Sequence, residues 1–206
     1  MKMKQKISIF IAMMCVVTLG LGLVACNGGQ AGSRSGEVLS DVELDSLMFS
    51  LDDAVYTLPV RFSELEENGW RPHDTDPPSG SADSFETDTL EPGGFAHWEL
   101  IIGNQNVLVT ISNLTEEVLP VSESHVTDVA LILGVNNARF ILPRGIMMGS
   151  THEEVVAAYG EPDVEHINDG APSFMIQYSS DDFILDIAID SESNLVNLIS
   201  LSYMGG

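Results

Sequence analysis

Histidines and carboxylates are the residue types in this chain that could bind a metal ion or move a proton, and their spacing argues against both roles. No two of the five histidines stand four residues apart on one helix, the spacing with which two imidazoles reach one zinc ion. His152 precedes two glutamates in "THEEVV", but the second histidine of a zinc-protease helix is absent. We therefore expect no zinc site, and we interpret His152 as a solvated residue in the first turn of a helix.

The segment "DSESNL", residues 190 to 195, begins like a calcium-binding loop, because oxygen-bearing side chains occupy its first, third and fifth positions. Leu195 stands where such a loop requires glycine, and no acid follows at the twelfth position. Asp182, Asp186 and Asp190 fall on one face of a strand, but four residues along a strand span about 13 Å, too far for one ion. The sequence therefore predicts a hairpin turn here and no metal site.

Motifs for nucleophilic catalysis and for nucleotide binding are also missing. The chain has no Gly-x-Ser-x-Gly elbow, no phosphate-binding loop and no dinucleotide fingerprint. Its two cysteines, Cys15 and Cys26, both lie near the N-terminus, so the rest of the chain has no thiol for a disulfide, a metal ligand or a nucleophile. Trp70, Phe95 and Trp98 could form an aromatic contact patch, although core packing is the favoured role of Trp98. We expect a protein that is not an enzyme and has no cofactor.

The N-terminus reads as a secretory signal. Three lysines precede an apolar run of 19 residues, from Ile7 to Ala25. This length would also suit an uncleaved membrane anchor. The border Leu23-Val24-Ala25-Cys26 resembles the bacterial lipobox, however, in which the thiol is diacylated and the chain is cut before the cysteine. The resemblance implies a signal peptide over residues 1–25 and lipid attachment at Cys26, because two acyl chains hold a protein stably on a membrane.

Residues 26–45 are rich in Gly and Ser and are interpreted as the lipidated cysteine and a flexible tether. The mature chain would carry five arginines and no lysine against 31 acidic residues, a net charge of −26. Such a chain repels nucleic acid, whose binding requires basic groups to replace phosphate counterions. It also contacts an anionic membrane only where the lipid holds it. A protein partner should present a basic patch.

Two stretches of the chain align without gaps at a shift of 84 positions: "FSLDDAVYTLP", residues 49–59, and "LGVNNARFILP", residues 133–143. Each predicts a hairpin followed by a short helix that begins with a capping box, Ser63 with Glu66 and Ser150 with Glu153. Chance convergence of turn and cap chemistry would leave the same pattern. We favour an internal duplication of the chain, with a first unit over residues 46–133 and a second over residues 134–206.

Strands are predicted after each helix, at 96–103, 106–113 and 126–133 in the first unit and at 173–179, 183–190 and 194–203 in the second. Val155, Val156 and Tyr159 form the stripe by which the second helix would cover the sheet. Residues 71–94 form a long polar loop, which we expect to be disordered except where Phe85 and Leu90 dock. The predicted fold class is α+β, with two related units in which a short helix packs on one face of an antiparallel sheet.

The stretch "LPRGIMMGSTHEEVVAAYGEPD", residues 142–163, resembles the helical segment of a family of small exported domains. These are typified by β-lactamase inhibitor protein and by the small lipoprotein subunit of the outer-membrane barrel assembly machinery. The resemblance implies helices on one face of an antiparallel sheet, and it carries over no catalytic residue. The whole layout also resembles uncharacterised lipoproteins of Gram-positive bacteria.

Taken together, these features lead us to expect a lipoprotein anchored in the cell membrane through Cys26 and displayed on its extracytoplasmic face. We expect it to act as a non-catalytic protein-interaction module for an envelope or extracellular protein with a basic patch. The alternative is a lipoprotein that binds a small molecule or a glycan. Neither expectation includes a metal, a cofactor or nucleic acid.

The first prediction concerns Cys26. Mass spectrometry of the membrane fraction should find a mature chain that begins at acylated Cys26, and the Cys26→Ala variant should be released or left unprocessed. A mature protein that retains Lys2 would contradict lipidation at this position.

Overall fold

The computed structural model describes residues 39–73, 79–80, 89–166 and 172–205. The signal segment, Cys26, most of the tether and Phe85 lie outside the described residues, so their predictions stay predictions. Among the described residues, no helix is long and apolar enough to cross a membrane.

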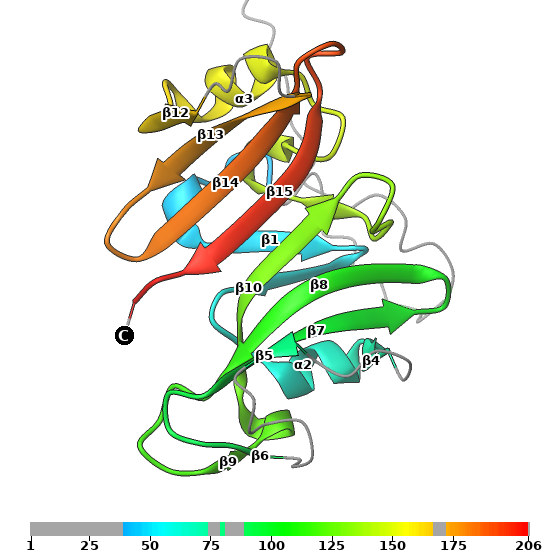
Figure 1. The fold of residues 1–206 in the computed structure, drawn as a ribbon, viewed down its shortest axis with the longest axis vertical. Coiled ribbons are helices and arrows are strands. Elements are labelled where there is room, and N and C mark those ends of the chain that lie inside the picture. Colours follow the sequence, from blue (N-terminus) through cyan, green and yellow to red (C-terminus); the bar gives the residue numbers. More distant parts are fainter. Residues whose placement is uncertain (1–38, 74–78, 81–88, 167–171, 206) are drawn as a thin grey trace, which may run out of the picture. The chain divides into compact units, whose positions relative to one another are not determined.

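Most of the described chain is antiparallel sheet with a few short helices, a mixed α+β arrangement (Figure 1). The main sheet runs in the order β12-β13-β14-β15-β10-β8-β7-β4, with β3 added to β10 and β5 to β7. Its strands are β3 (Val60–Arg61), β4 (Arg71–Pro72), β5 (Ser79–Gly80), β7 (Phe95–Ile102), β8 (Gln105–Ser112), β10 (His125–Ile132), β12 (Val164–His166), β13 (Ser173–Ser179), β14 (Phe183–Asp190) and β15 (Val196–Tyr203).

The two halves of the chain meet inside this sheet, where β10 pairs with β15 along five residue pairs from Asp128–Ser202 to Ile132–Leu198. We call this pairing the seam. Because β10 belongs to the first half and β15 to the second, the seam makes one continuous sheet out of both.

Smaller elements complete the fold. Within the described residues, a three-stranded sheet in the order β11-β1-β2 and a two-stranded sheet of β6 and β9 accompany two α-helices and three 3₁₀-helices. Their bounds are β1 (Met48–Leu51), β2 (Ala54–Thr57), β6 (Thr89–Leu90), β9 (Leu119–Pro120), β11 (Phe140–Ile141), α2 (Phe62–Glu67), α3 (His152–Tyr159), η1 (Leu44–Ser46), η2 (Val121–Glu123) and η3 (Pro143–Gly145).

The alternation of side chains explains why the long strands form one layer with two different faces. Along β14, Phe183, Leu185 and Ile187 are buried, while Asp186 and Asp190 point to the other face. β13 and β14 begin and end at the residues that the pattern predicted, and β7, β8, β10 and β15 differ from it by one or two residues at their ends. The predicted strands are therefore confirmed.

Helix α3 forms over His152–Tyr159, but its capping box lies one residue later than predicted. The Thr151 hydroxyl accepts a hydrogen bond from the Glu154 amide, and the Glu154 carboxylate accepts one from the Thr151 amide. The Ser150 hydroxyl instead accepts a bond from the Met147 amide and closes the preceding turn. Val155 is fully buried in the core, and the helix ends at Gly160.

The start of the first helix differs from the prediction. Helix α2 begins directly after β3, and Arg61 at its N-cap makes no side-chain hydrogen bond, so the predicted Ser63 capping box is wrong. The physical reason is that a backbone group replaces the side-chain cap. The Phe62 amide at the start of α2 donates a hydrogen bond to the carbonyl of Ser124, directly after η2, at 2.9 Å.

The two aligned stretches also fold differently from each other. Residues 49–59 form the predicted hairpin of β1 and β2, which turns at Asp52-Asp53. In residues 133–143 the predicted hairpin does not form, because β11 pairs with β1. Phe49 of β1 then contacts Tyr56 on one side and Phe140 on the other, with ring centroids 5.5 and 5.4 Å away. The aligned segments thus meet around one aromatic ring.

The second prediction tests the packing of α3. Val155→Asp buries an unpaired carboxylate and should lower the free energy of unfolding by about 3 kcal/mol or more. Denaturant unfolding of the full chain in detergent, followed by tryptophan fluorescence, measures this change. The matched control is Ala157→Asp on the exposed side of the same helix, which should cost no more than about 1 kcal/mol. Equal effects of the two substitutions would contradict the burial of Val155.

Candidate functional site

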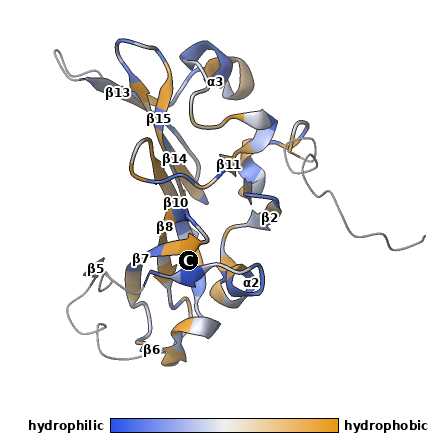
Figure 2. Cartoon of the chain, turned by 90° about the vertical axis from the view of Figure 1, so that its right-hand side faces the viewer, coloured by the Kyte–Doolittle hydropathy of each residue, from blue (hydrophilic) through white to orange (hydrophobic). Residues whose placement is uncertain are grey.

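The two faces of the main sheet have different surroundings. Figure 2 shows α2, α3, β2 and β11 on one side of the sheet, where they cover the buried face. No helix of the described chain lies over the other side, which is the side that faces the viewer in Figure 1. We call this side the open face.

The strand register fixes which side chains stand together on the open face. One row across the sheet consists of Gln177, Asp186, Ser200, Ala130, Leu108 and Glu99. The neighbouring row consists of Met175, Ala188, Leu198 and Ile132 from β13 to β10, and on β8 and β7 Asn106 stands opposite Ile101. Short and apolar side chains therefore occupy the centre of the face around the seam, and carboxylates stand to either side of it.

A hollow of about 510 Å³ lies at one end of the seam. Ile132, Ala188 and Leu198 contribute to its lining, together with Leu133 and Leu195. Leu133 is 62 % exposed and Leu195 is 37 % exposed. Large apolar side chains that stay exposed around a hollow are typical of contact sites for another molecule.

Asp190 orders the turn at the edge of this hollow. Its Oδ1 accepts hydrogen bonds from the Ser193 amide at 2.7 Å, the Ser193 hydroxyl at 2.8 Å and the Glu192 amide at 3.2 Å. The bond from the Ser193 amide does most to hold the pKa of this carboxyl below its usual range. The segment from Asp190 to Leu195 is thus a hairpin turn, as the sequence predicted.

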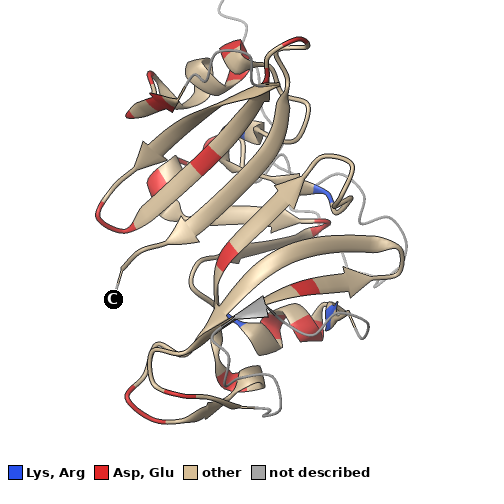
Figure 3. Ribbon diagram, in the orientation of Figure 1, with Lys and Arg blue, Asp and Glu red and all other residues tan. Residues whose placement is uncertain are grey.

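Electrostatically the open face is acidic. The described residues hold 24 acidic residues against four arginines and no lysine, and Figure 3 shows acidic residues on β14, β10 and β7 of this face. These are Asp186, Asp128 and Glu99. The guanidinium of Arg71, at the β4 edge, donates to the carbonyl oxygens of Glu66 and Trp70.

Amide side chains hold two of these carboxylates in place. Gln177 Nε2 donates to Asp186 Oδ1 at 2.8 Å in the second half of the sheet. Asn106 Nδ2 donates to Glu99 Oε1 in the first half, and His73 Nδ1 lies 3.1 Å from Glu99 Oε2. Each half of the open face therefore has a carboxylate paired with an amide across its middle strands.

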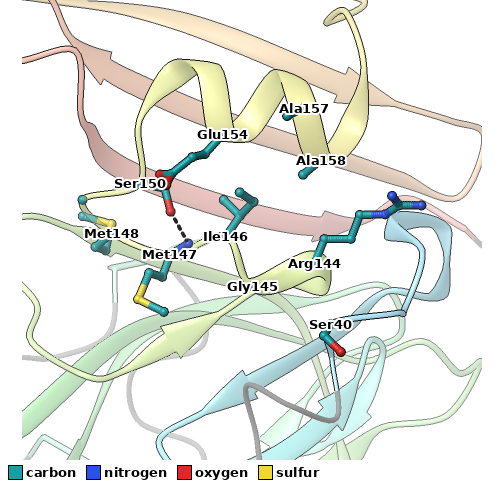
Figure 4. A pocket seen from close by; sticks show the side chains of 11 residues that line it. Ser40, Arg144, Gly145, Ile146, Met147, Met148, Ser150, Glu154, Ala157 and Ala158 are labelled. Atoms are coloured by element: carbon teal, nitrogen blue, oxygen red, sulfur yellow. Dashed lines mark hydrogen bonds between the residues drawn. The ribbon is translucent and has the colours of Figure 1, made fainter.

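Two further clefts lie among the described residues, and the polar groups of the first stabilise the local fold. A cleft of about 630 Å³ lies between α3 and the segment from Arg144 to Ser150 (Figure 4). Arg144 at one end pairs with Glu43, and Glu154 at the other end belongs to the capping box of α3. The dashed line in Figure 4 is the bond from the Met147 amide to the Ser150 hydroxyl, which closes the loop.

The other cleft, of about 680 Å³, lies beside the β1–β2 turn. Asp52 Oδ1 accepts hydrogen bonds from Gln105 Nε2 and from the Arg139 amide, both at 3.0 Å. Burial raises the pKa of the Asp52 carboxyl. These bonds fasten the turn to β8 and to the residue before β11, so they explain the local fold without a ligand.

The residues that the sequence singled out do not converge on one site. The described residues contain no group of three or more His, Cys, Asp or Glu side chains that could hold a metal ion. Trp98 packs on Phe62 with ring centroids 5.6 Å apart, Trp70 is 1 % exposed, and Phe95 is 40 % exposed. Because Trp70 is buried in the core, the three aromatic residues form no common contact patch.

His152 is also placed differently from the prediction. Its ring is partly buried and contacts Phe174 edge to face, with ring centroids 5.3 Å apart. The reading of His152 as a solvated residue is therefore wrong, because the side chain packs back onto β13.

Sequence reasoning did not find the open-face residues of the seam. Ala130, Leu198 and Ser200 carry no motif, and their signal is only the alternation of the strands. Their proximity depends on which strands pair across the two halves, which the alternation leaves open.

Comparison of the chain with protein-family models, with curated proteins and with solved structures found no match in any of the three. The open face, with its apolar hollow and its carboxylates, therefore has to be interpreted from its own geometry.

The third prediction concerns the turn at the hollow. The lowered pKa of Asp190 means that its ionised form stabilises the folded state above the pKa of the unfolded chain, about 3.9, and that this contribution is lost as the pH falls through the lower folded value. Asp190→Ala should therefore melt below the unsubstituted chain at neutral pH, and the difference should shrink in acid. Asp181→Ala, in the β13–β14 turn at the other end of β14, is the control and should change little. A difference that persists unchanged in acid would contradict the role of the ionised carboxylate.

Proposed function

We propose that this protein is a lipoprotein anchored through Cys26 at the extracytoplasmic face of the cell membrane, where it acts as a non-catalytic protein-interaction module. The observation that carries the proposal is the open face of the main sheet, with exposed leucines around a hollow and carboxylates on both sides. The partner is an envelope or extracellular protein that presents a basic patch.

The size of the open face supports a protein partner. An eight-residue strand is about 26 Å long, and the six strands from β13 to β7 span about 24 Å, which gives a footprint of about 600 Å². A specific interface covers about 800 Å² on each partner. The open face together with the exposed loop at Leu133 and Val135 therefore approaches the area that one partner needs.

The charge supports a basic partner and argues against nucleic acid. Acidic residues outnumber arginines six to one in the described chain. This field speeds the approach of a cationic partner and repels phosphates.

We further propose that the two halves are related units, each a short helix packed on one face of an antiparallel sheet. The order of elements supports this. From α2 the chain continues through β4, β7, β8 and β10, with the short strands β5, β6 and β9 between them, and from α3 through β12, β13, β14 and β15. The strand order is thus the same on either side when it is read outward from the seam. This layout agrees with the tandem arrangement implied by the resemblance of residues 142–163 to the inhibitor-protein family.

The alternative, a small-molecule or glycan-binding lipoprotein, has weaker support. The clefts of about 630 and 680 Å³ have the size of a ligand site. Their central polar groups, among them Ser150, Glu154 and Asp52, are engaged in capping and turn hydrogen bonds. A free ligand would have to compete with these bonds.

The fourth prediction tests the open face as the contact surface. A photo-crosslinking residue at Ser200 should give one discrete crosslinked product in intact cells, whereas the same residue at Ala157, on the exposed side of α3, should not. Ala130→Arg places a long cation at the seam and should abolish that product, while Ala157→Arg should leave it intact. Equal crosslinking from Ser200 and Ala157 would contradict the proposed surface.

Salt and chelators give a second readout for the same complex. The association rate should fall as the salt concentration rises, because exposed charges are screened, whereas the dissociation rate should change less. A chelator should leave both the complex and the melting temperature unchanged. A large loss of stability on chelation would show that a metal site contributes.

A further inference from the structure

We propose that the open face binds a basic amphipathic helix, which lies along the seam strands β10 and β15. This inference rests on the proposed function and specifies the chemistry and the secondary structure of the partner segment. It follows from four features of the open face, namely its backbone hydrogen bonding, its relief, its length and the positions of its carboxylates.

The backbone of the seam strands favours a helix over an extended segment. β10 is paired with β8 and β15, and β15 is paired with β14 and β10, so both edges of each strand are occupied. An extended segment laid on this face would find no backbone partners there and would leave its own amides and carbonyls unpaired. A helix satisfies its backbone internally and needs only side-chain contacts.

The relief of the face leaves room for a helix above the seam. The outward residues at its middle are Ala130 and Ser200, which stand directly opposite each other. Ser202 continues the short side chains in one direction. A helix with its side chains is about 10 Å across, or about two strand spacings of 4.8 Å, so its backbone can approach closest where these side chains are short.

The apolar side chains near the seam fit one stripe of such a helix. Leu198 and Ile132 stand opposite each other at the end near the hollow, and Ala188 is the neighbour of Leu198 on β14. Leu108 stands beside Ala130 on the other flank. Eight strand residues cover about 26 Å, which matches about 17 helical residues at 1.5 Å each. The hollow can take one large apolar side chain from this stripe.

The carboxylates lie where the basic flanks of the helix would pass. Asp186 on β14 and Glu99 on β7 belong to one row, four strand spacings or about 19 Å apart. This width accommodates a helix with a lysine or arginine reaching outward on each side. Asp190 adds a carboxylate about 13 Å along β14 from Asp186, and Asp128 adds one at the seam.

The arginines of the described chain do not compete for these positions. Arg139 lies 4.0 Å from Asp53, Arg144 pairs with Glu43, and Arg71 binds backbone carbonyls at the edge of the sheet. Arg61 lies in β3, directly before α2, where the backbone of β3 pairs with the start of β10 at His125. The open-face carboxylates therefore present a negative surface to a cationic helix.

The experiment uses synthetic peptides of about 18 residues, the helical length that matches one eight-residue strand of the sheet. The probe peptide has a leucine–alanine stripe with lysines on both flanks and a lactam staple that fixes the helix. One control peptide has the same composition in scrambled order, so that the stripe is lost, and a second has glutamates in place of the lysines. Fluorescence anisotropy with the full chain in detergent measures each dissociation constant.

We expect the lysine helix to bind at least about tenfold more tightly than the scrambled peptide, and the glutamate helix not to bind, because hydrophobic fit and charge each contribute. Asp128→Asn combined with Asp186→Asn should weaken the lysine helix about tenfold, and Leu198→Ser should weaken it by a similar factor. Glu153→Gln, on the exposed side of α3, is the matched control and should have no effect.

Two outcomes would overturn the proposal. One is equal binding of the helical and scrambled lysine peptides, which would show attraction to charge alone. The other is binding that the open-face substitutions leave unchanged. The crosslinking at Ser200 separates the two proposals: if it succeeds while the lysine helix fails to bind, the open face contacts a protein but not through a basic helix.

Discussion

The fold depends on the pairing of β10 with β15. These strands come from different halves of the chain, and their five residue pairs join the strands of both halves into one ten-stranded sheet. Val129 and Leu131 of β10 stand opposite Leu201 and Ile199 of β15, and all four are buried or nearly so. The same register places Ala130 and Ser200 outward. One pairing thus builds the core and positions the open face, because a shift by one residue would exchange the two sets of side chains.

The covering layer makes the two faces unequal. α3 contributes Val155 to the core, and the aromatic contacts of Phe49 join β1, β2 and β11 beneath the sheet. Tyr159 donates its hydroxyl to the Pro143 carbonyl at 2.6 Å and so fixes α3 to η3. This layer covers the apolar side chains on one face of the sheet, and the other face needs no covering for the chain to fold. Its residues are available for recognition.

The sequence predicted local structure well and pairing poorly, for a physical reason. Alternation in 183–190 defined β14 and the burial of its apolar residues, because period-2 patterning depends only on neighbouring residues. The predicted Ser63 capping box does not form, because the Ser124 carbonyl, which is far along the chain next to η2, accepts the hydrogen bond from the first amide of α2. The hairpin predicted in 133–143 does not form, because β11 pairs with β1 instead. The seam, and with it the open face, rests on long-range register that no local pattern encodes.

An open sheet face with an apolar centre would normally favour the binding of a second copy of the same chain. Here the carboxylates of Asp128, Asp186 and Asp190 oppose that, because two such faces would bring like charges together as the leucines approached. The sheet edges are also short, with β12 of three residues on one side and β4, which contains Pro72, on the other, so they offer little backbone for pairing. The acidity therefore has a role beyond solubility. It opposes self-association on the face whose apolar centre would favour it, and under the proposed function a basic partner would gain from both features at once.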